Sequence, residues 1–352
     1  MNDIKILLTA IGAPGAANII GALKSNGERQ VKIIGTDIHA TPSGRPFVDS
    51  FHVVPRGSSG YYPRTMTDIC SVYSPDVLLP LSTEELLSLA RSKKSIEDST
   101  GTKVCIGSER SIEIANDKKS LFEFLSKHDI PVPHFIPFDS PAGFNHAKVL
   151  LNRPICIKPA FAHGGRGMRM IDDKHDTTEM FLNSKPENAS ISFAEAFRLI
   201  RGVTNLPGML AMEYLPGREY SVDILCQNGN ARVVVVRLRE EVRSGISFRS
   251  VVVNDRRIDQ IAKDVCEALG FDGPIGIQLR EDERGDPKVI EVNPRLHGSV
   301  ILSVAAGANI PYLSVKQTFG EPFEVPSIKV GTRLARYWGA TTYDSDGLPH
   351  TF

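Results

Sequence analysis

The segment VIEVNPRLHGS, from Val289 to Ser299, carries the strongest functional pattern in the sequence. Its β-branched residues predict a strand, and the two-residue period of a strand places Glu291 and Asn293 side by side on one face. Carboxylate and amide oxygens suit Mg²⁺, and Pro294 ends the strand so that Arg295 leaves it beside the same spot. A cation and a metal that share one anionic ligand indicate a polyphosphate. Because Asn-Pro also opens ordinary turns, this segment alone does not settle the function.

The composition is that of a globular protein with two or three domains. The chain has 352 residues, of which 41% are hydrophobic and 23% are charged. Its 41 basic residues balance 41 acidic residues, so we expect a small-molecule partner and neither nucleic acid nor a membrane surface. Five scattered cysteines without a CxxC pair argue against a disulfide framework and a zinc site. No signal peptide or transmembrane run is recognisable, so the expected location is the cytoplasm.

Residues 1–112 alternate strands with helices, which predicts a doubly wound α/β domain. Asp37 ends the second strand about where a dinucleotide-binding fold places its ribose carboxylate, so an NAD-dependent oxidoreductase is one alternative. The loop Gly12–Gly15 argues against it, because its glycines do not form GxGxxG and Pro14 removes a backbone donor. A tight turn that lines a crevice is the favoured interpretation.

A later strand of this domain is followed by Ser82, Thr83, Glu84 and Glu85, which are expected to cap a helix. Ligands collect at this edge of such sheets, where Glu84 or Glu85 would be placed to contact a substrate amine. Acidic residues in a first helical turn are also favoured by the helix dipole, which is the simpler interpretation.

Two lysines and a Gly-rich turn follow. A helix is expected from Ser111, and Lys118 near its start opposes the helix dipole, so it is either solvated or needed for another purpose. The strand PICIK delivers Lys158. The turn His163–Gly167 then offers backbone N–H groups to phosphate oxygens, although it is not a Walker A loop. Each feature alone also fits an ordinary surface lysine or hairpin.

Two further strands flank Pro216 and Gly217, with Glu213 before the turn and Glu219 after it. Such a linker can offer backbone groups to an adenine edge, and a carboxylate just beyond it can bind ribose hydroxyls. The next strands carry four arginines that suit capture of a carboxylate or belong to a solvated face, namely Arg237, Arg239, Arg243 and Arg249. The tail after Pro326, which carries the only tryptophan, Trp338, is expected to form an edge strand.

In this order, the motifs from about Asn116 to Ser299 resemble the ATP-grasp superfamily, most closely the ATP-binding domains of the carbamoyl-phosphate synthase large subunit. The resemblance implies an α/β fold that is α+β in its ATP-grasp part. A Rossmann-like domain (1–112) would precede a small subdomain with a Gly-rich lid (113–207). A large subdomain with the metal site and a C-terminal strand (208–352) would complete the fold.

The resemblance also assigns roles to residues. The residues that would bind the nucleotide are Lys118, Lys158, His163, Gly164, Gly165, Gly167, Glu213, Tyr214, Leu215 and Glu219. The residues that would hold Mg²⁺, or Mn²⁺ as a substitute, are Gln278, Glu291 and Asn293. Lys158 and Arg295 would act on the phosphates. The chemistry of the guanidinium group, and not the resemblance, adds Arg237, Arg243 and Arg249 as candidates for binding the substrate carboxylate.

Two departures qualify this assignment. Many relatives have Asp where this chain has Gln278, which leaves the site one negative charge poorer and the number of metal ions open. A single ATP-grasp unit, without an amidotransferase or a second synthase half, argues against carbamoyl phosphate synthesis.

A stand-alone unit instead resembles a carboxylate–amine ligase, which activates a carboxylate with ATP and releases ADP and phosphate. No nucleophilic Ser or Cys is needed for that chemistry. The alternatives are phosphorylation of a small carboxylate or carbonate without amide formation, and a non-catalytic nucleotide sensor. The expected substrates are a small carboxylate and an amine, and a homodimer is left open.

Overall fold

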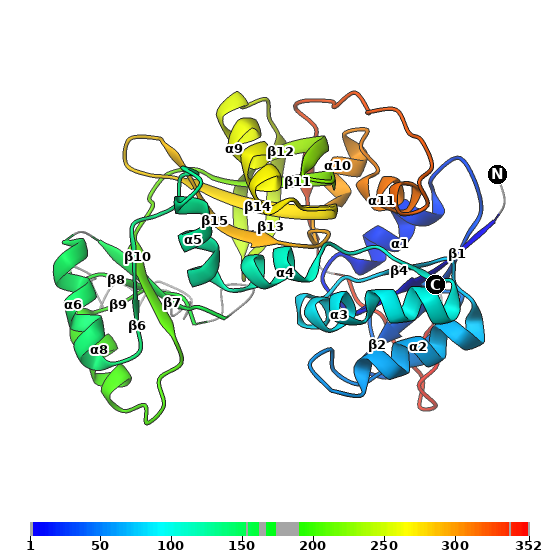
Figure 1. Cartoon of the computed structure of the whole chain (residues 1–352), viewed down its shortest axis with the longest axis horizontal. Coiled ribbons are helices and arrows are strands. Elements are labelled where there is room, and N and C mark those ends of the chain that lie inside the picture. Colours follow the sequence, from blue (N-terminus) through cyan, green and yellow to red (C-terminus); the bar gives the residue numbers. More distant parts are fainter. Residues whose placement is uncertain (1–2, 153, 162–166, 174–189, 338, 351–352) are drawn as a thin grey trace. The chain divides into compact units, whose positions relative to one another are not determined.

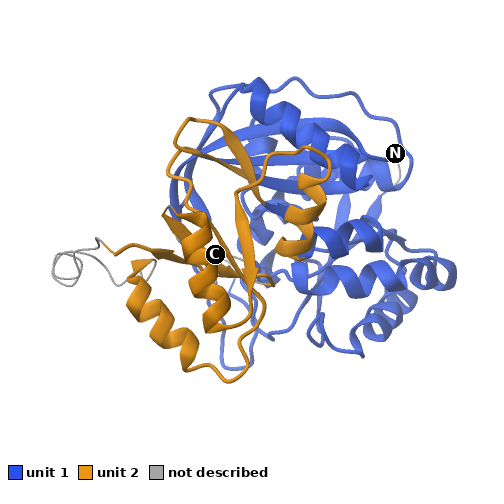
Figure 2. Ribbon diagram, turned by 60° about the vertical axis from the view of Figure 1, so that its left-hand side comes forward, with its two compact units in different colours: residues 1–116, 219–278, 291–352 blue, residues 117–218, 279–290 orange. Residues whose placement is uncertain are grey.

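The computed structural model describes residues 3–152, 154–161, 167–173, 190–337 and 339–350 (Figure 1). These residues form two compact units, shown in Figure 2. Unit 1 contains residues 1–116, 219–278 and 291–352, and unit 2 contains residues 117–218 and 279–290. The domain limits expected at residues 112 and 207 stay predictions of the sequence. No helix in the described ranges is long and apolar enough to cross a membrane.

Unit 1 begins with a five-stranded parallel sheet in the order β3-β2-β1-β4-β5. Its strands are β1 (Ile4–Leu8), β2 (Val31–Asp37), β3 (Ser50–Val53), β4 (Val77–Leu79) and β5 (Lys103–Val104). Between them lie α1 (Ala16–Lys24), the 3-10 helix η1 (Arg45–Phe47), α2 (Tyr62–Tyr73) and α3 (Thr83–Thr100). Helix α2 packs beside α3, whereas α1 contacts helices from the C-terminal part of the unit (Figure 1). The doubly wound α/β sheet is thus confirmed.

The second sheet has six strands in the order β15-β14-β11-β12-β13-β16. Its strands are β11 (Glu219–Gln227), β12 (Asn230–Arg243), β13 (Ile246–Val252), β14 (Gly273–Glu281), β15 (Pro287–Asn293) and β16 (Arg333–Ala335). Helices α9 (Arg256–Leu269), α10 (Ile301–Ala305) and α11 (Ile310–Thr318) accompany it. The expected edge strand of the tail is confirmed in β16, although Trp338 lies outside the described residues.

One apolar cluster joins the two sheets of unit 1. Strands β1, β2 and β4 contribute to it together with β11, β12, β13, α10 and α11. Its members include Ile6, Leu8, Ile33, Leu79, Leu225, Val233, Val235, Val252, Leu296, Leu302 and Val315. Apolar side chains far apart in the sequence therefore share one buried core.

The expected helix from Ser111 is divided in two. Helix α4 (Glu109–Asn116) ends before Asp117, and α5 (Lys118–Ser126) begins after it. The backbone of Asp117 is extended, and its Oδ1 accepts a hydrogen bond of 2.6 Å from the backbone N–H of Ser120. A single uninterrupted helix is therefore wrong, because this carboxylate caps a new helix. Lys118 becomes the first residue of α5.

Unit 2 contains a five-stranded sheet in the order β6-β10-β7-β8-β9. Its strands are β6 (Phe135–Phe138), β7 (Ile155–Pro159), β8 (Arg169–Ile171), β9 (Ser190–Ile191) and β10 (Met209–Glu213). Helices α6 (Pro141–Leu151) and α8 (Phe193–Arg201) lie side by side on this sheet, and their apolar sides share a core with it (Figure 1). The predicted lid residues His163, Gly164, Gly165 and Arg166 lie outside the described residues.

Candidate functional site

The predicted metal ligands lie on two neighbouring strands of unit 1. Glu291 and Asn293 are two residues apart on β15, and Gln278 is on β14, the next strand of the sheet. Glu291 and Gln278 are partly exposed, whereas Asn293 is buried. One carboxylate and two amide groups make an oxygen donor set that fits Mg²⁺ better than a soft metal. The chemistry of these three side chains therefore fits Mg²⁺. Glu291 supplies the only negative charge among the three.

Arg295 lies two residues after the end of β15, and its guanidinium group is hydrogen-bonded to other residues of unit 1. Its Nε donates a 3.0 Å hydrogen bond to Thr83 Oγ1, and its Nη1 donates a 2.7 Å bond to the carbonyl oxygen of Leu296. Burial lowers the pKa of Arg295, and the charges of Glu291 and Glu85 oppose this effect. An arginine remains charged in proteins, so a partly buried cation stands directly after β15.

The expected helix cap at residues 82–85 is confirmed, with reciprocal hydrogen bonds between Ser82 and Glu85. The Glu85 carboxylate is buried and accepts hydrogen bonds from the hydroxyls of Thr9 and Tyr62 and from backbone N–H groups. Burial raises its pKa. Glu84 is exposed and accepts a 2.6 Å hydrogen bond from Ser58. Glu85 therefore serves the cap and the end of the first sheet.

The glycine loop of the first domain packs against protein, which disfavours a dinucleotide there. Gly15 has a φ of 95°, and a Cβ placed on it would lie 2.0 Å from the carbonyl oxygen of Gly298. Asp37 accepts hydrogen bonds from the backbone N–H groups of Gly12 (2.7 Å) and His39 (3.0 Å). The loop and its carboxylate thus support each other and the segment after β15.

The C-terminal tail covers the loop that follows Asp37. Tyr343 donates a hydroxyl hydrogen bond of 2.5 Å to the carbonyl oxygen of Pro42. Arg45 donates a 2.7 Å hydrogen bond to the carbonyl oxygen of Gly347. The tail therefore packs on the loop that begins a few residues after Asp37.

The two predicted nucleotide lysines are both buried in unit 2. Lys118 is 7% exposed and Lys158 is 9% exposed. The backbone N–H of Lys118 donates to the carbonyl oxygen of Ala160 at 3.2 Å, which ties the start of α5 to the end of β7. Lys158 donates to the carbonyl oxygen of Ile290 at 3.3 Å and lies 5.0 Å from the ring centre of Phe122. Of the two interpretations offered for Lys118, the structure therefore disfavours a solvated surface lysine.

The predicted adenine linker is held rigidly before its turn. Glu213 accepts hydrogen bonds from the backbone N–H of His134 (3.0 Å) and from Lys288. Burial raises the pKa of Glu213, but these bonds outweigh burial and lower the pKa overall. The backbone N–H of Tyr214 donates to Pro154 at 2.8 Å, whereas that of Leu215 has no hydrogen-bond partner among the described residues. The linker thus keeps one backbone donor available.

The predicted ribose carboxylate, Glu219, pairs with Arg239 across β11 and β12. Arg239 also donates to Ser247 Oγ at 2.9 Å and to the carbonyl oxygen of Gly245 at 2.7 Å. The Glu219 side chain is 20% exposed and that of Arg239 is 4% exposed, so the carboxylate is oriented and still reachable.

The structure does not bring the other three arginines together on one partner. Arg237 is 0% exposed and pairs with Asp223. The side chains of Arg243 and Arg249 are 54% and 71% exposed, and both lie beside Glu241. The sequence alone could not distinguish the buried arginine, Arg237, from the two exposed ones, Arg243 and Arg249.

Sequence reasoning missed a buried polar cluster in unit 1. Its members are Asp223, Arg237, His297, Ser299 and Ser303. The available signal was Asp223 itself, a charged residue within the apolar strand SVDILC. A buried charge in such a strand requires a partner, although the sequence does not say which one.

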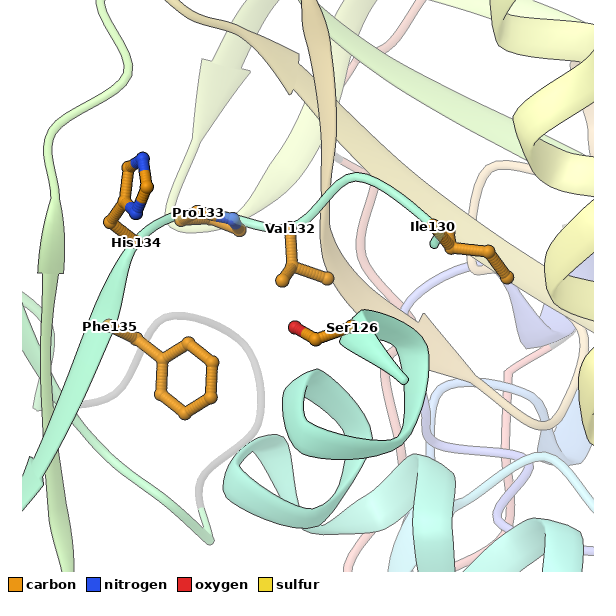
Figure 3. Close-up of a pocket in the computed structure, with 6 residues that line it drawn as sticks. All are labelled: Ser126, Ile130, Val132, Pro133, His134 and Phe135. Carbon is orange, nitrogen blue, oxygen red and sulfur yellow. The ribbon is translucent and has the colours of Figure 1, made fainter. Parts of the chain in front are cut away.

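A pocket of about 370 Å³ in unit 2 contains none of the predicted site residues (Figure 3). It is lined by Ser126, Ile130, Val132, Pro133, His134 and Phe135. Ser126, Val132 and Phe135 point toward one another across it, and His134 points away (Figure 3). Its lining contains no Lys, Arg, Asp or Glu side chain, so it lacks the fixed charges that the predicted nucleotide site requires.

Comparisons with known proteins support the two parts of the chain separately. Residues 6–105 match a family described as the PylC-like N-terminal domain. Residues 205–338 match a family described as ATP-grasp in the biosynthetic pathway with Ter operon.

Curated relatives include the large chain of carbamoyl phosphate synthase. The protein from Methanothermobacter thermautotrophicus is 24% identical over 264 residues, which are 73% of this chain and 24% of the relative. That from Clostridium botulinum is 29% identical over 213 residues, which are 58% of this chain and 17% of the relative. The chain thus spans about a quarter or less of the length of these relatives.

Solved structures agree on the fold. N5-carboxyaminoimidazole synthetase from Staphylococcus aureus, complexed with ADP, has a TM-score of 0.69 at 16% identity, over 93% of this chain and 80% of that one. L-amino acid ligase from Bacillus licheniformis has a TM-score of 0.64 at 17% identity, over 93% and 75%. Residues 205–338 thus match an ATP-grasp family, residues 6–105 match a PylC-like N-terminal domain, and the chain as a whole shares the fold of these solved structures.

Proposed function

We propose that this protein is an ATP-dependent carboxylate–amine ligase that forms an amide or peptide bond through an acyl phosphate. The observation that carries the proposal is the arrangement at the end of β15. There, Glu291 and Asn293 lie two residues apart on β15, Gln278 lies on the neighbouring strand β14, and the partly buried cation Arg295 follows at once. Metal ligands and a fixed cation next to each other suit a triphosphate.

The residues of unit 2 would bind the rest of the nucleotide. Lys118 and Lys158 are proposed to contact phosphate oxygens, and the N–H of Leu215 is proposed to donate to an adenine nitrogen. Glu219 of unit 1 would bind the ribose hydroxyls while Arg239 orients it. Bound Mg²⁺, held by Gln278, Glu291 and Asn293, would neutralise phosphate charge.

The reaction follows from the weak electrophilicity of a carboxylate. A carboxylate oxygen bonds to the γ-phosphorus, the bond to the β–γ bridging oxygen breaks, and ADP leaves. The amine nitrogen then bonds to the carbonyl carbon of the acyl phosphate, phosphate leaves with the C–O electron pair, and the nitrogen loses a proton. The protein must mainly position groups and neutralise charge, which matches a site rich in Lys, Arg and Glu.

Recognition of the substrate carboxylate is proposed for Arg243 and Arg249. Both guanidinium groups are more than half exposed, and a planar guanidinium can bind a carboxylate through two hydrogen bonds. Arg237 is completely buried, so a substrate does not reach it in this structure.

The decisive experiment is a screen of carboxylate and amine pairs that scores ADP release dependent on both partners. Hydroxylamine in place of the amine should trap the activated carboxylate as a hydroxamate. Formation of AMP and pyrophosphate would contradict the acyl phosphate. ADP release that needs the carboxylate alone would instead support phosphorylation without amide formation.

A further inference from the structure

Several hydrogen bonds converge on a buried group of side chains in unit 1. Asp223 Oδ1 accepts from Arg237 Nη2 at 2.7 Å and from His297 Nδ1 at 2.9 Å, and Asp223 Oδ2 accepts from Ser303 Oγ at 2.5 Å. Arg237 Nη1 donates to Ser299 Oγ at 2.8 Å. Strands β11 and β12 thereby hold three side chains of the segment 297–303. We call these five residues the Asp223 cluster.

The charges of the Asp223 cluster balance internally. Burial raises the pKa of the Asp223 carboxyl, but the charge of Arg237 and the hydrogen bond from His297 outweigh burial and lower the pKa far below its usual range. Burial lowers the pKa of His297. A neutral His297 that donates its Nδ1–H leaves one carboxylate and one guanidinium, which is a compensated buried pair.

The Asp223 cluster fixes the segment that carries Arg295. The chain leaves β15 at Asn293 and reaches His297 four residues later, so Arg295 lies midway between two anchored points. His297 fits because residue 276 of β14 is glycine, where an added Cβ would lie 2.2 Å from His297 Nε2. Gly298 then packs on Pro14, where a Cβ would meet the carbonyl oxygen at 2.3 Å.

Nothing in the proposed reaction requires the Asp223 cluster to touch a substrate. Asp223 is 2% exposed, and Arg237 is fully buried. A buried ion pair contributes little net stability compared with apolar packing. We therefore look for the effect of this pair in the position of the segment that it binds.

We propose that Asp223 and Arg237 are positioning residues, which place Arg295 for its interaction with the phosphates of the nucleotide. This inference rests on the proposed function, because it gives Arg295 the phosphate role. A displacement of about 1 Å at a phosphate-binding cation is enough to weaken binding and turnover substantially. Arg237 thereby acts through Arg295 and not on the substrate carboxylate.

A double-mutant cycle tests this coupling with the Mg²⁺ complex of the non-hydrolysable ATP analogue AMP-PNP as probe. Calorimetry would give its Kd for the wild type, Asp223→Asn, Arg295→Met and the double variant. We expect Asp223→Asn to weaken binding about 10-fold in the wild type and less than about twofold when Arg295 is already Met. Equal losses in both backgrounds would overturn the proposal, since they would show a general structural effect.

The matched control is Lys316→Met, which breaks the pair between Lys316 and Glu28 elsewhere in unit 1. It should lower the melting temperature and leave the Kd for AMP-PNP unchanged. If Asp223→Asn does not fold, Ser299→Ala and Ser303→Ala remove one hydrogen bond each, and the same cycle is run with them. An unchanged Kd in both serine variants would also overturn the proposal. A wild type that does not bind the probe refutes the proposed function itself, which separates the two failures.

Discussion

Gly15 and Gly298 approach each other so closely that neither position has room for a side chain. A Cβ on Gly15 would lie 2.0 Å from Gly298 O, and one on Gly298 would lie 2.3 Å from Pro14 O. The first βα loop of the chain therefore packs closely against the segment that follows β15. A loop that would bind phosphate in a dinucleotide fold here packs against Gly298, three residues after Arg295.

Gly15→Ala and Gly298→Ala should each destabilise the fold by roughly 2 kcal/mol or more, because overpacking adds to any backbone strain. Urea unfolding would measure the loss. Gly27→Ala is the control, since Gly27 also has a positive φ (77°) but its Cβ would meet nothing within 4 Å. A loss at Gly15 no larger than that at Gly27 would contradict the close packing.

Glu291→Gln should lower turnover by about 100-fold or more while ATP affinity changes much less, because the charge matters most during phosphoryl transfer. Steady-state ADP release and nucleotide binding would separate the two effects. Glu240→Gln provides a control on β12 that pairs with Arg333 and lies outside the proposed metal set. An unimpaired Glu291→Gln enzyme would remove the metal assignment.

Asp223→Asn should cost about 3–5 kcal/mol at neutral pH, because it leaves the charge of Arg237 uncompensated in the interior. The folded-state pKa of Asp223 lies below the usual value of 3.8, so the stabilisation is present above that value. It is lost as the pH falls through the folded-state pKa. The difference between wild type and variant should be constant from about pH 7 to pH 5 and shrink below about pH 4. Denaturant unfolding across this range would show a pH-independent difference if the carboxylate were not ionised in the fold.

Arg243→Met and Arg249→Met should raise the KM for the carboxylate substrate and leave the KM for ATP unchanged, because an exposed guanidinium is lost without disturbing the core. Arg333→Met is the control, since Arg333 is 67% exposed and pairs with Glu240 on the same sheet. If both variants behave like Arg333→Met, other residues bind the carboxylate.

Local patterns predicted most elements and the strand that carries the candidate metal ligands. The period of β15 follows from alternation, and the start of α3 follows from the capping residues 82–85, which neighbour one another in sequence. The break at Asp117 was missed because a capping residue and a mid-helix residue look alike without the contacts of the next turn.

Long-range pairs lay beyond the reach of the sequence. Asp223 and His297 are 74 residues apart, and Glu213 and Lys288 are 75 residues apart. Each carboxylate is recognisable as buried from its apolar strand, but its partner depends on how the strands pair. The arginines were misjudged as a group for the same reason, since Arg237 and Arg243 share a strand and not an environment.

The apolar cluster shared by the two sheets of unit 1 limits how this protein can be divided or recombined. Leu225, Val233 and Val235 complete a core begun by Ile6 and Ile33, more than 180 residues earlier in the chain. A fragment that stops near residue 112 would expose that core to water and aggregate. Exchange of the N-terminal domain between relatives would therefore succeed only when the facing strands are exchanged with it. We expect the residues of the two sheets that form this core to change together in evolution.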